Sequence, residues 1–137
     1  MPAREVSFRA TREDTLMHQR ELRHLLEALI REDRPLRPEE RDTYADLLGK
    51  ALLGVDSELP CPVPPASLAR HWRQDQYRKV RTAADFLRFL MYADGPGLGE
   101  MWREALEIVL CCSARALEVA TRLSAEMLVR EKQVHEF

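Results

Sequence analysis

Glycine, lysine and cysteine are all scarce in this chain. It has five glycines in 137 residues, and three of them fall between Gly95 and Gly99. Because a β-sheet protein usually needs more glycines in its turns, this scarcity favours helices. The three cysteines have no regular spacing, which argues against a disulfide framework and indicates a reducing compartment. The first residues contain no apolar core for a signal peptide, and the uncharged apolar stretches are too short to span a bilayer. These absences predict a cytoplasmic protein without a membrane segment.

The composition is otherwise that of one ordinary soluble domain. Hydrophobic residues make up 45% of the chain and charged residues 32%, and 137 residues can bury a core without metal or disulfide bonds. The three lysines stand against eighteen arginines, which are spread along the whole sequence. This bias is typical of a GC-rich coding sequence and indicates a bacterial or phage protein. The net charge of −2 argues against nucleic-acid binding over the whole surface.

The first third of the chain predicts a helix behind a short arm. Residues 1–10 are expected to form an extended N-terminal arm, and Thr11 or Asp14 could cap a helix that runs to about Asp33. The apolar residues of this helix recur at helical spacing and form one stripe, which predicts packing on a core. They are Leu22, Leu25, Leu26, Leu29 and Ile30.

The middle of the chain is punctuated by proline. A second helix is predicted to begin at Pro38, which is followed by acids in the first turn, and to end near Gly54. Residues 55–65 hold four prolines and are expected to run as a Pro-rich extended crossover. The next segment allows two interpretations. One helix could run unbroken over residues 66–93, or Thr82 could cap a separate helix.

The last segment, from about Leu98 to Lys132, has no proline and predicts a helix about 50 Å long. Its apolar residues cover a wide sector, so it is either the central helix or a helix that also packs on a second copy of the chain. The candidates for self-association in a homo-oligomer include small residues that would let another helix come close. They are Trp102, Val109, Ala116, Ala120, Leu123 and Met127. The complete pattern predicts an all-α fold over residues 1–137, a single irregular bundle of four to five helices with a long C-terminal helix.

Positive charge is concentrated in residues 70–81, which contain five basic residues and one acid. The residues before this segment carry ten bases against thirteen acids, and those after it carry six against nine. Such a concentration is typical of a surface for an acidic partner, either an acidic protein surface or nucleic acid. The candidate partner-binding residues are Arg70, Arg73, Tyr77, Arg78, Lys79 and Arg81. Trp72 falls on the predicted core face of a helix.

These observations predict a non-enzymatic adaptor or regulator that acts by binding a macromolecule. A nucleic-acid-binding protein that uses residues 70–81 is the alternative. In a competing structural interpretation, the arginines of this segment simply pair with the acids of neighbouring helices.

Motifs for metal or nucleophilic chemistry are weak. Glu21 and His24 have the spacing used in di-metal helical bundles, but such a site needs a second copy, and the chain has none. Cys61 is the more exposed of the cysteine candidates, and no histidine is placed beside it by the sequence. We therefore predict no catalytic residue, no metal and no other cofactor.

A third hypothesis concerns two arginine–histidine pairs. His18 follows Arg12 by six residues, and His135 follows Arg130 by five. Both spacings are similar to the loose Arg-x(4–6)-His pattern of helical ribonucleases of the HEPN class. The resemblance implies that the histidine performs acid–base chemistry on a ribose hydroxyl while the arginine holds the phosphate.

Overall fold

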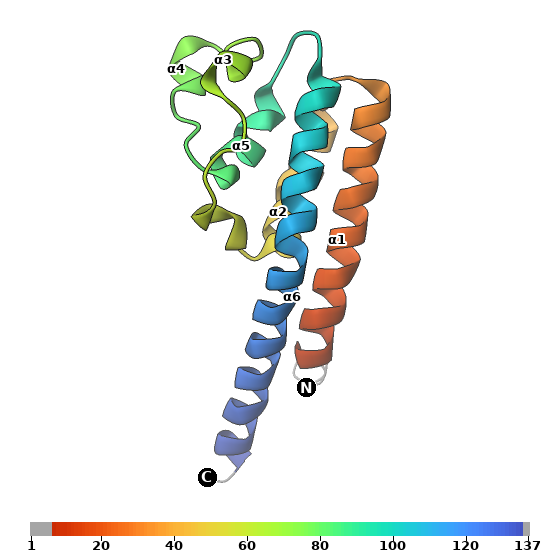
Figure 1. Ribbon diagram of the computed structural model, residues 1–137. Coiled ribbons are helices and arrows are strands. Elements are labelled where there is room, and N and C mark those ends of the chain that lie inside the picture. The colour runs from red at the N-terminus through yellow and green to blue at the C-terminus, as the bar shows by residue number, and fades with distance from the viewer. Residues whose placement is uncertain (1–6, 136–137) are drawn as a thin grey trace.

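Two long antiparallel helices form the frame of the molecule. The computed structural model describes residues 7–135. Side chains are described for residues 11–126, Val129, Arg130 and Lys132. Helix α1 (Ser7–Glu32) runs beside helix α6 (Leu98–His135) in the opposite direction (Figure 1). At 1.5 Å per residue α6 is about 57 Å long and α1 about 39 Å, so α6 extends past the start of α1.

The start of α1 corrects the predicted N-terminal arm. Residues 7–10 are helical rather than extended, and residues 1–6 lie outside the described part of the chain. Thr11 and Asp14 therefore lie inside the helix and do not cap it. The Thr11 carbonyl instead accepts a hydrogen bond from the hydroxyl of Thr15, one turn further along. The predicted end of the helix near Asp33 is confirmed.

A close contact joins the end of α1 to the start of α6. Asp33 adopts a left-handed backbone conformation after α1, and its carboxylate accepts a hydrogen bond from the Gly99 N–H. The first N–H groups of a helix have no partner within the helix, so this carboxylate caps α6 from a distant part of the sequence. A Cβ atom at position 99 would lie 2.8 Å from Asp33 Oδ1 and 3.2 Å from the Ile30 carbonyl oxygen. Glycine is thus needed here for close approach.

Helix α2 (Pro38–Leu52) confirms the prediction for the second helix. Pro38 stands in its first turn, and the Glu40 carboxylate accepts a hydrogen bond from the Arg37 N–H at 2.9 Å, which satisfies a donor at the helix start. The helix ends where Leu53 and Gly54 both take positive φ angles.

A smaller lobe of short helices lies between α2 and α6 in the sequence and packs beside the first half of α6 (Figure 1). Its elements are the 3₁₀ turn η2 (Val55–Glu58), α3 (Pro65–Leu68), α4 (Gln74–Tyr77), α5 (Ala83–Phe89) and the 3₁₀ turn η3 (Leu90–Tyr92). The predicted crossover of residues 55–65 therefore starts as a 3₁₀ turn and ends in the first residue of α3. Only the part from Leu59 to Pro64 has no helical structure.

The prediction of one unbroken helix over residues 66–93 is wrong, and the alternative prediction of a separate helix capped by Thr82 is confirmed. The Thr82 hydroxyl accepts a hydrogen bond from the Asp85 N–H at 3.1 Å, and the Asp85 carboxylate accepts one from the Thr82 N–H at 3.2 Å. The chain just before this cap is extended because it pairs with the crossover. The Cys61 N–H donates to the Arg81 carbonyl at 3.0 Å, and the Ala83 N–H donates to the Leu59 carbonyl at 2.8 Å.

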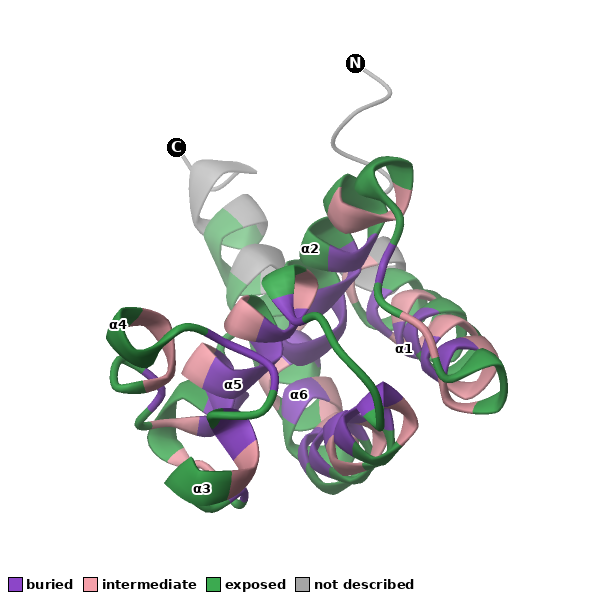
Figure 2. Ribbon diagram, turned by 90° about the horizontal axis from the view of Figure 1, so that it is seen from above, coloured by how far each residue is buried: buried purple, intermediate pink, exposed green. Residues whose placement is uncertain are grey.

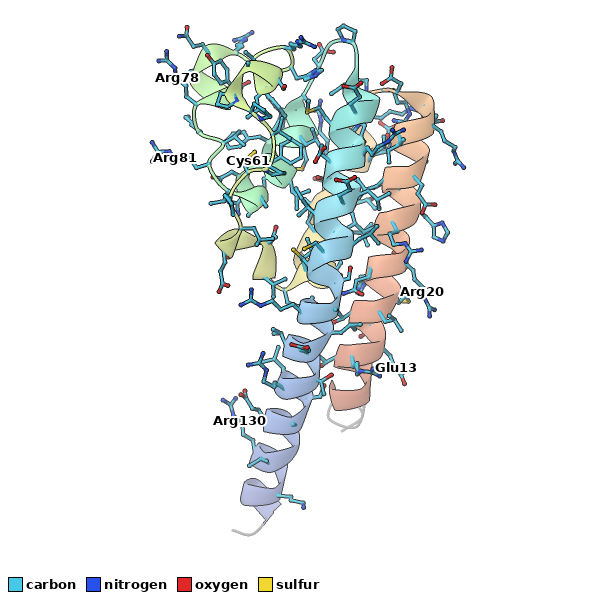
Figure 3. All side chains as sticks on the ribbon, in the orientation of Figure 1. Glu13, Arg20, Cys61, Arg78, Arg81 and Arg130 are labelled. Atoms are coloured by element: carbon cyan, nitrogen blue, oxygen red, sulfur yellow. The ribbon has the colours of Figure 1, made fainter. Side chains whose placement is uncertain are left out.

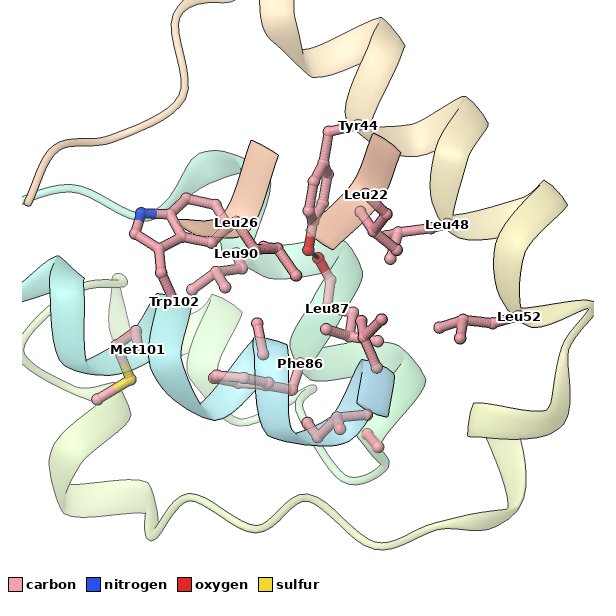
Figure 4. Close-up of a cluster of buried hydrophobic side chains, with 14 of the residues drawn as sticks. Leu22, Leu26, Tyr44, Leu48, Leu52, Phe86, Leu87, Leu90, Met101 and Trp102 are labelled. Atoms are coloured by element: carbon pink, nitrogen blue, oxygen red, sulfur yellow. Dashed lines mark hydrogen bonds between the residues drawn. The ribbon is translucent and has the colours of Figure 1, made fainter. Parts of the chain in front are cut away.

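The core lies where α1, α2, α5 and α6 turn their apolar faces toward one another, as the buried positions in Figure 2 show. Three residues of the predicted α1 stripe are buried, namely Leu22, Leu26 and Leu29. The other two, Leu25 and Ile30, are half-buried. Tyr44 and Trp102 meet edge to face with ring centroids 5.7 Å apart (Figure 4). The predicted all-α fold with a long C-terminal helix is confirmed, since the described residues form helices and only one isolated β-bridge.

The self-association candidates on α6 divide into two groups. Four of them are buried in the core of this chain itself: Trp102, Val109, Ala116 and Ala120. Leu123 is 41% exposed, and the Met127 side chain lies outside the described part. A second copy could therefore not reach the first four without displacing the chain's own helices. Among the described residues, no helix is both long enough and apolar enough to cross a membrane.

An ion pair at the α1–α2 corner makes stability depend on pH. The Arg34 guanidinium hydrogen-bonds both Glu40 oxygens, at 2.7 and 3.0 Å, and these bonds lower the pKa of Glu40 to about 2. A carboxyl group with a depressed pKa stabilises the folded state above its unfolded pKa and loses that effect as pH falls toward 2. We expect Glu40→Gln to lower the free energy of unfolding by about 2 kcal/mol at pH 7 and by much less at pH 2.5.

Urea titrations of both proteins at several pH values measure this difference. Glu39→Gln is the matched control, because Glu39 is exposed in the same helical turn and forms no ion pair among the described residues. If the loss in free energy of unfolding caused by Glu40→Gln stayed constant from pH 7 to pH 2.5, the ion pair with Arg34 would not be the source of the pH dependence.

Candidate interaction surface

The structure places the predicted basic residues on the outer side of the small lobe. Within this small lobe of short helices, we call the segment of residues 70–81 the basic lobe. Its five cationic side chains are all exposed: Arg70, Arg73, Arg78, Lys79 and Arg81. Arg78 and Arg81 point away from the bundle, on the side opposite to Arg20 of α1 (Figure 3). Because the helix is broken, these residues do not share one helix face; they lie on two turns and an extended segment around α4.

The ion pairs of the described residues do not include the basic lobe. They connect Arg34, Lys50, Arg88 and Arg115 with nearby carboxylates. Asp85, which follows the lobe, binds Arg88 and two backbone N–H groups instead. The interpretation in which the lobe's arginines pair with acids of neighbouring helices is therefore wrong for this part of the chain. Five positive charges remain directed at solvent.

The two aromatic residues of the basic lobe belong to the protein's own packing. Trp72 is buried, as its core-face position predicts, and its Nε1–H donates to the Phe89 carbonyl at 2.8 Å. Its ring meets Phe86 edge to face at 6.4 Å. Tyr77 is half-buried and packs against the same core. Neither ring is free to act as a protruding anchor for a partner.

A groove of about 710 Å³ opens beside the basic lobe. Its walls come from the turn after α3, from α4, and from η3 with the segment that follows it. The lining residues are Arg70, His71, Trp72, Arg73, Gln76, Tyr92, Asp94 and Gly95. Tyr92 is 58% exposed, the largest exposure among the large apolar side chains described. The groove therefore combines two solvent-facing arginines with an accessible aromatic ring.

Tyr92 and Arg41 are parts of this surface that the sequence did not reveal. The Arg41 guanidinium lies over the Tyr92 ring, 5.4 Å from its centroid, and Arg41 Nε donates to the Met91 carbonyl at 3.2 Å. A cation over an aromatic face is favourable, and it fixes the guanidinium beside the groove. Arg41 comes from α2 and Tyr92 from η3, so only the folded chain brings them to the basic lobe.

Contacts between His71 and Asp94 join the two walls of the groove. The Asp94 N–H donates to the His71 carbonyl at 3.2 Å, and His71 Nδ1 lies 3.1 Å from the Asp94 carbonyl oxygen. The Asp94 carboxylate accepts a hydrogen bond from the Gly95 N–H at 2.8 Å. Gly95 has a φ of 95°, and a Cβ there would lie 3.3 Å from the Arg70 carbonyl oxygen. The groove is thus shaped before any ligand binds.

The candidates for metal and thiol chemistry do not form a site in the described part of the chain. No group of three or more His, Cys, Asp or Glu residues there could hold a metal ion. Glu21 and His24 are exposed on α1. Burial raises the pKa of the Cys61 thiol, which lies 3.6 Å from the Val63 carbonyl oxygen, so its reactive thiolate is less populated.

The two arginine–histidine pairs of the ribonuclease hypothesis lie on antiparallel helices. Gln19 of α1 is level with Ser113 of α6, to whose carbonyl it donates. His18 is therefore level with a residue some twenty positions before His135, or about 30 Å along the helix axis. The His135 side chain lies outside the described part. The structure does not bring the two pairs into one site.

No family model matches the chain, and no match to it was found among curated proteins or solved structures. Any function must accordingly be argued from the residues and geometry of this chain.

Proposed function

We propose that this protein is a non-enzymatic adaptor or regulator that binds an acidic macromolecular partner through its basic lobe. The observation that supports this proposal is the set of five exposed cationic side chains in residues 70–81, none of which forms an ion pair with a described carboxylate. A chain with net charge −2 that leaves this much positive charge unpaired in one place has a local field suited to an acidic surface.

The architecture is consistent with a presenting scaffold. The basic residues stand on short turns, and the long helices α1 and α6 form the frame behind them (Figure 1). Binding residues are commonly carried by loops that a rigid frame positions. The lobe itself is anchored by the buried indole of Trp72 and its hydrogen bond to Phe89, so its cations are held on an ordered surface.

Two classes of partner fit a basic surface, an acidic protein surface and nucleic acid. Both would be attracted by the same charges, and both would bind less tightly as salt screens them. The accessible ring of Tyr92 beside Arg70 and Arg73 is the observation that favours nucleic acid as a candidate.

Charge reversal in the basic lobe tests the proposal. We expect Arg78→Glu combined with Arg81→Glu to weaken the binding of an anionic polymer by roughly ten-fold at low salt, since both side chains are exposed and contribute only charge. Fluorescence anisotropy with labelled polyglutamate and with a labelled oligonucleotide measures the effect on both kinds of partner.

The matched control carries the same charge change on α1, as Arg20→Glu combined with Arg23→Glu. Both arginines are exposed and lie outside the basic lobe. Equal losses in the two double variants would show that binding follows net charge alone and would overturn the proposal. Absence of binding to both polymers by the wild-type protein would do the same.

A further inference from the structure

We propose that the groove beside the basic lobe binds single-stranded nucleic acid, with a base stacked on Tyr92 and the backbone phosphates held by Arg70 and Arg73. This inference rests on the proposed function and names the partner class of that same surface. It adds an aromatic ring, Tyr92, and a further guanidinium, Arg41, to the charged segment.

The exposed ring is the first observation that carries it. Tyr92 leaves 58% of its surface in solvent and lines the groove, while Arg41 covers it at 5.4 Å from the ring centroid. A ring that was only part of the core would be covered by apolar side chains, as Trp72 and Phe86 are. An aromatic ring with an open side is a platform on which any nucleobase can stack.

The charges around the ring are the second observation. Arg70 and Arg73 line the groove, are exposed, and form no ion pair with a described carboxylate. Arg41 adds a third guanidinium from α2, and Gln76 adds a carboxamide that can donate or accept hydrogen bonds. Guanidinium groups bind phosphate oxygens in a planar, two-point geometry.

The acid in the groove does not cancel this charge. Asp94 is the one carboxylate among the lining residues, and its Oδ1 already accepts the Gly95 N–H at 2.8 Å. The two arginines that line the groove, Arg70 and Arg73, outnumber this one carboxylate, and Arg41 adds a further guanidinium over the Tyr92 ring. An anionic backbone would therefore meet more positive than negative charge along the groove.

The combination of an aromatic ring with arginines favours a single strand over the other anionic partners. A duplex presents phosphates but hides the faces of its bases, so it could use the arginines and not the ring. An acidic polypeptide likewise supplies carboxylates for the arginines but no regularly spaced planar groups for stacking. Of these partners, only an unpaired strand offers exposed base faces and phosphates together.

Fluorescence anisotropy on the full-length chain tests the inference, with labelled oligo(dT) and oligo(U) of about 12 nucleotides. We expect Tyr92→Ala to weaken binding by roughly ten-fold and Tyr92→Phe to leave it unchanged, since stacking needs the ring and not the hydroxyl. We expect Arg70→Ala combined with Arg73→Ala to weaken binding. The negative slope of log affinity against log salt should become less steep, by about 0.7 for each arginine removed. Arg20→Ala, which removes an exposed cation far from the groove, should leave both affinity and slope unchanged.

Several outcomes decide the question. If oligo(dT) or oligo(U) binds the wild-type protein and this binding is lost in Tyr92→Ala, the inference is supported. The oligonucleotide that binds more tightly then identifies the partner as DNA or RNA. Equal binding by Tyr92→Ala and wild type overturns it, as does a duplex of the same length bound as tightly as the single strand. If polyglutamate binds through Arg78 and Arg81 while neither oligonucleotide binds, this inference is wrong and the proposed function stands. If no anionic polymer binds, both are wrong.

Discussion

Replacing Trp102 by alanine should lower the free energy of unfolding by about 3–5 kcal/mol, the usual cost of removing a large buried aromatic side chain. Trp102 is fully buried on α6, and its ring packs edge to face on Tyr44 of α2 at 5.7 Å. Its Nε1–H also donates to the Arg34 carbonyl at 2.8 Å, in the connection between α1 and α2. One side chain thus joins α6 to α2 and to the connection between α1 and α2. Since domains of this size are stable by about 5–15 kcal/mol, the variant should be close to the limit of folding.

Urea unfolding followed by circular dichroism measures this loss. Trp102→Phe is the informative companion, because it keeps an aromatic ring in the core and removes only the indole N–H and part of the volume. We expect it to cost about 1–2 kcal/mol. A loss below 1 kcal/mol in Trp102→Ala would show that the helices are held together elsewhere.

The same phenylalanine variant also tests whether the chain is one cooperative domain. The sequence contains only two tryptophans, so Trp102→Phe leaves Trp72 as the single tryptophan, inside the basic lobe. We expect its fluorescence to change at the same urea concentration as the helical signal of the whole molecule, since Trp72 packs on Phe86 in the common core. If the fluorescence and the helical signal changed at two different urea concentrations, the basic lobe would unfold independently of the helical bundle.

Helix boundaries set by local chemistry could be predicted, and a boundary set by a distant part of the chain could not. Pro38 and the Thr82–Asp85 cap act within a few residues, so their effect is visible in the sequence. The extended backbone between α4 and α5, in contrast, pairs at Arg81 with Cys61, twenty residues away, and no local pattern indicates that contact. The apolar spacing over residues 66–93 still identified Trp72 as a buried position, because burial follows the core even where the helix is interrupted.

The candidate surface also combines features that the sequence could predict with features that depend on distant parts of the chain. The positive charge of residues 70–81 and the burial of Trp72 could be predicted, since charge is written in the sequence and the tryptophan sits among regularly spaced apolar residues. The contribution of Tyr92 and Arg41 could not, because nothing near either residue distinguishes it. Their contact requires α2 and η3 to pack together, and that packing depends on the whole core.

The sequence predicts that small residues on α6 let another helix come close, and in the structure α1 of the same chain lies along α6. Ala116 and Ala120 are buried within the chain itself. The facing part of α1 continues the leucine stripe with polar residues, Thr15 and Gln19, which a search for apolar spacing passes over. Close approach of the two helices therefore serves a polar contact as well as an apolar one.

Gln19 should accordingly be a major determinant of stability. It is 5% exposed, and its Nε2 donates to the Ala51 carbonyl at 3.1 Å and to the Ser113 carbonyl at 3.0 Å. Ala51 lies in the last turn of α2, where carbonyl groups lack a partner within the helix, so the amide satisfies an acceptor that would otherwise be buried unpaired. We expect Gln19→Met, which keeps the length and removes the donor, to cost about 2–3 kcal/mol in urea unfolding.

Gln19→Glu separates the hydrogen bonds from mere packing. At neutral pH a buried carboxylate would face two carbonyl oxygens, so this variant should lose more stability than Gln19→Met despite its nearly identical shape. Burial without a cation raises the pKa of such a group, and its protonated form can donate one of the two bonds. The deficit relative to wild type at the same pH should therefore shrink as pH falls from 7 to 5, whereas the Gln19→Met deficit should stay constant. Equal, pH-independent deficits in the two variants would show that only side-chain volume matters at this position, and that the three helices do not depend on the amide that joins them.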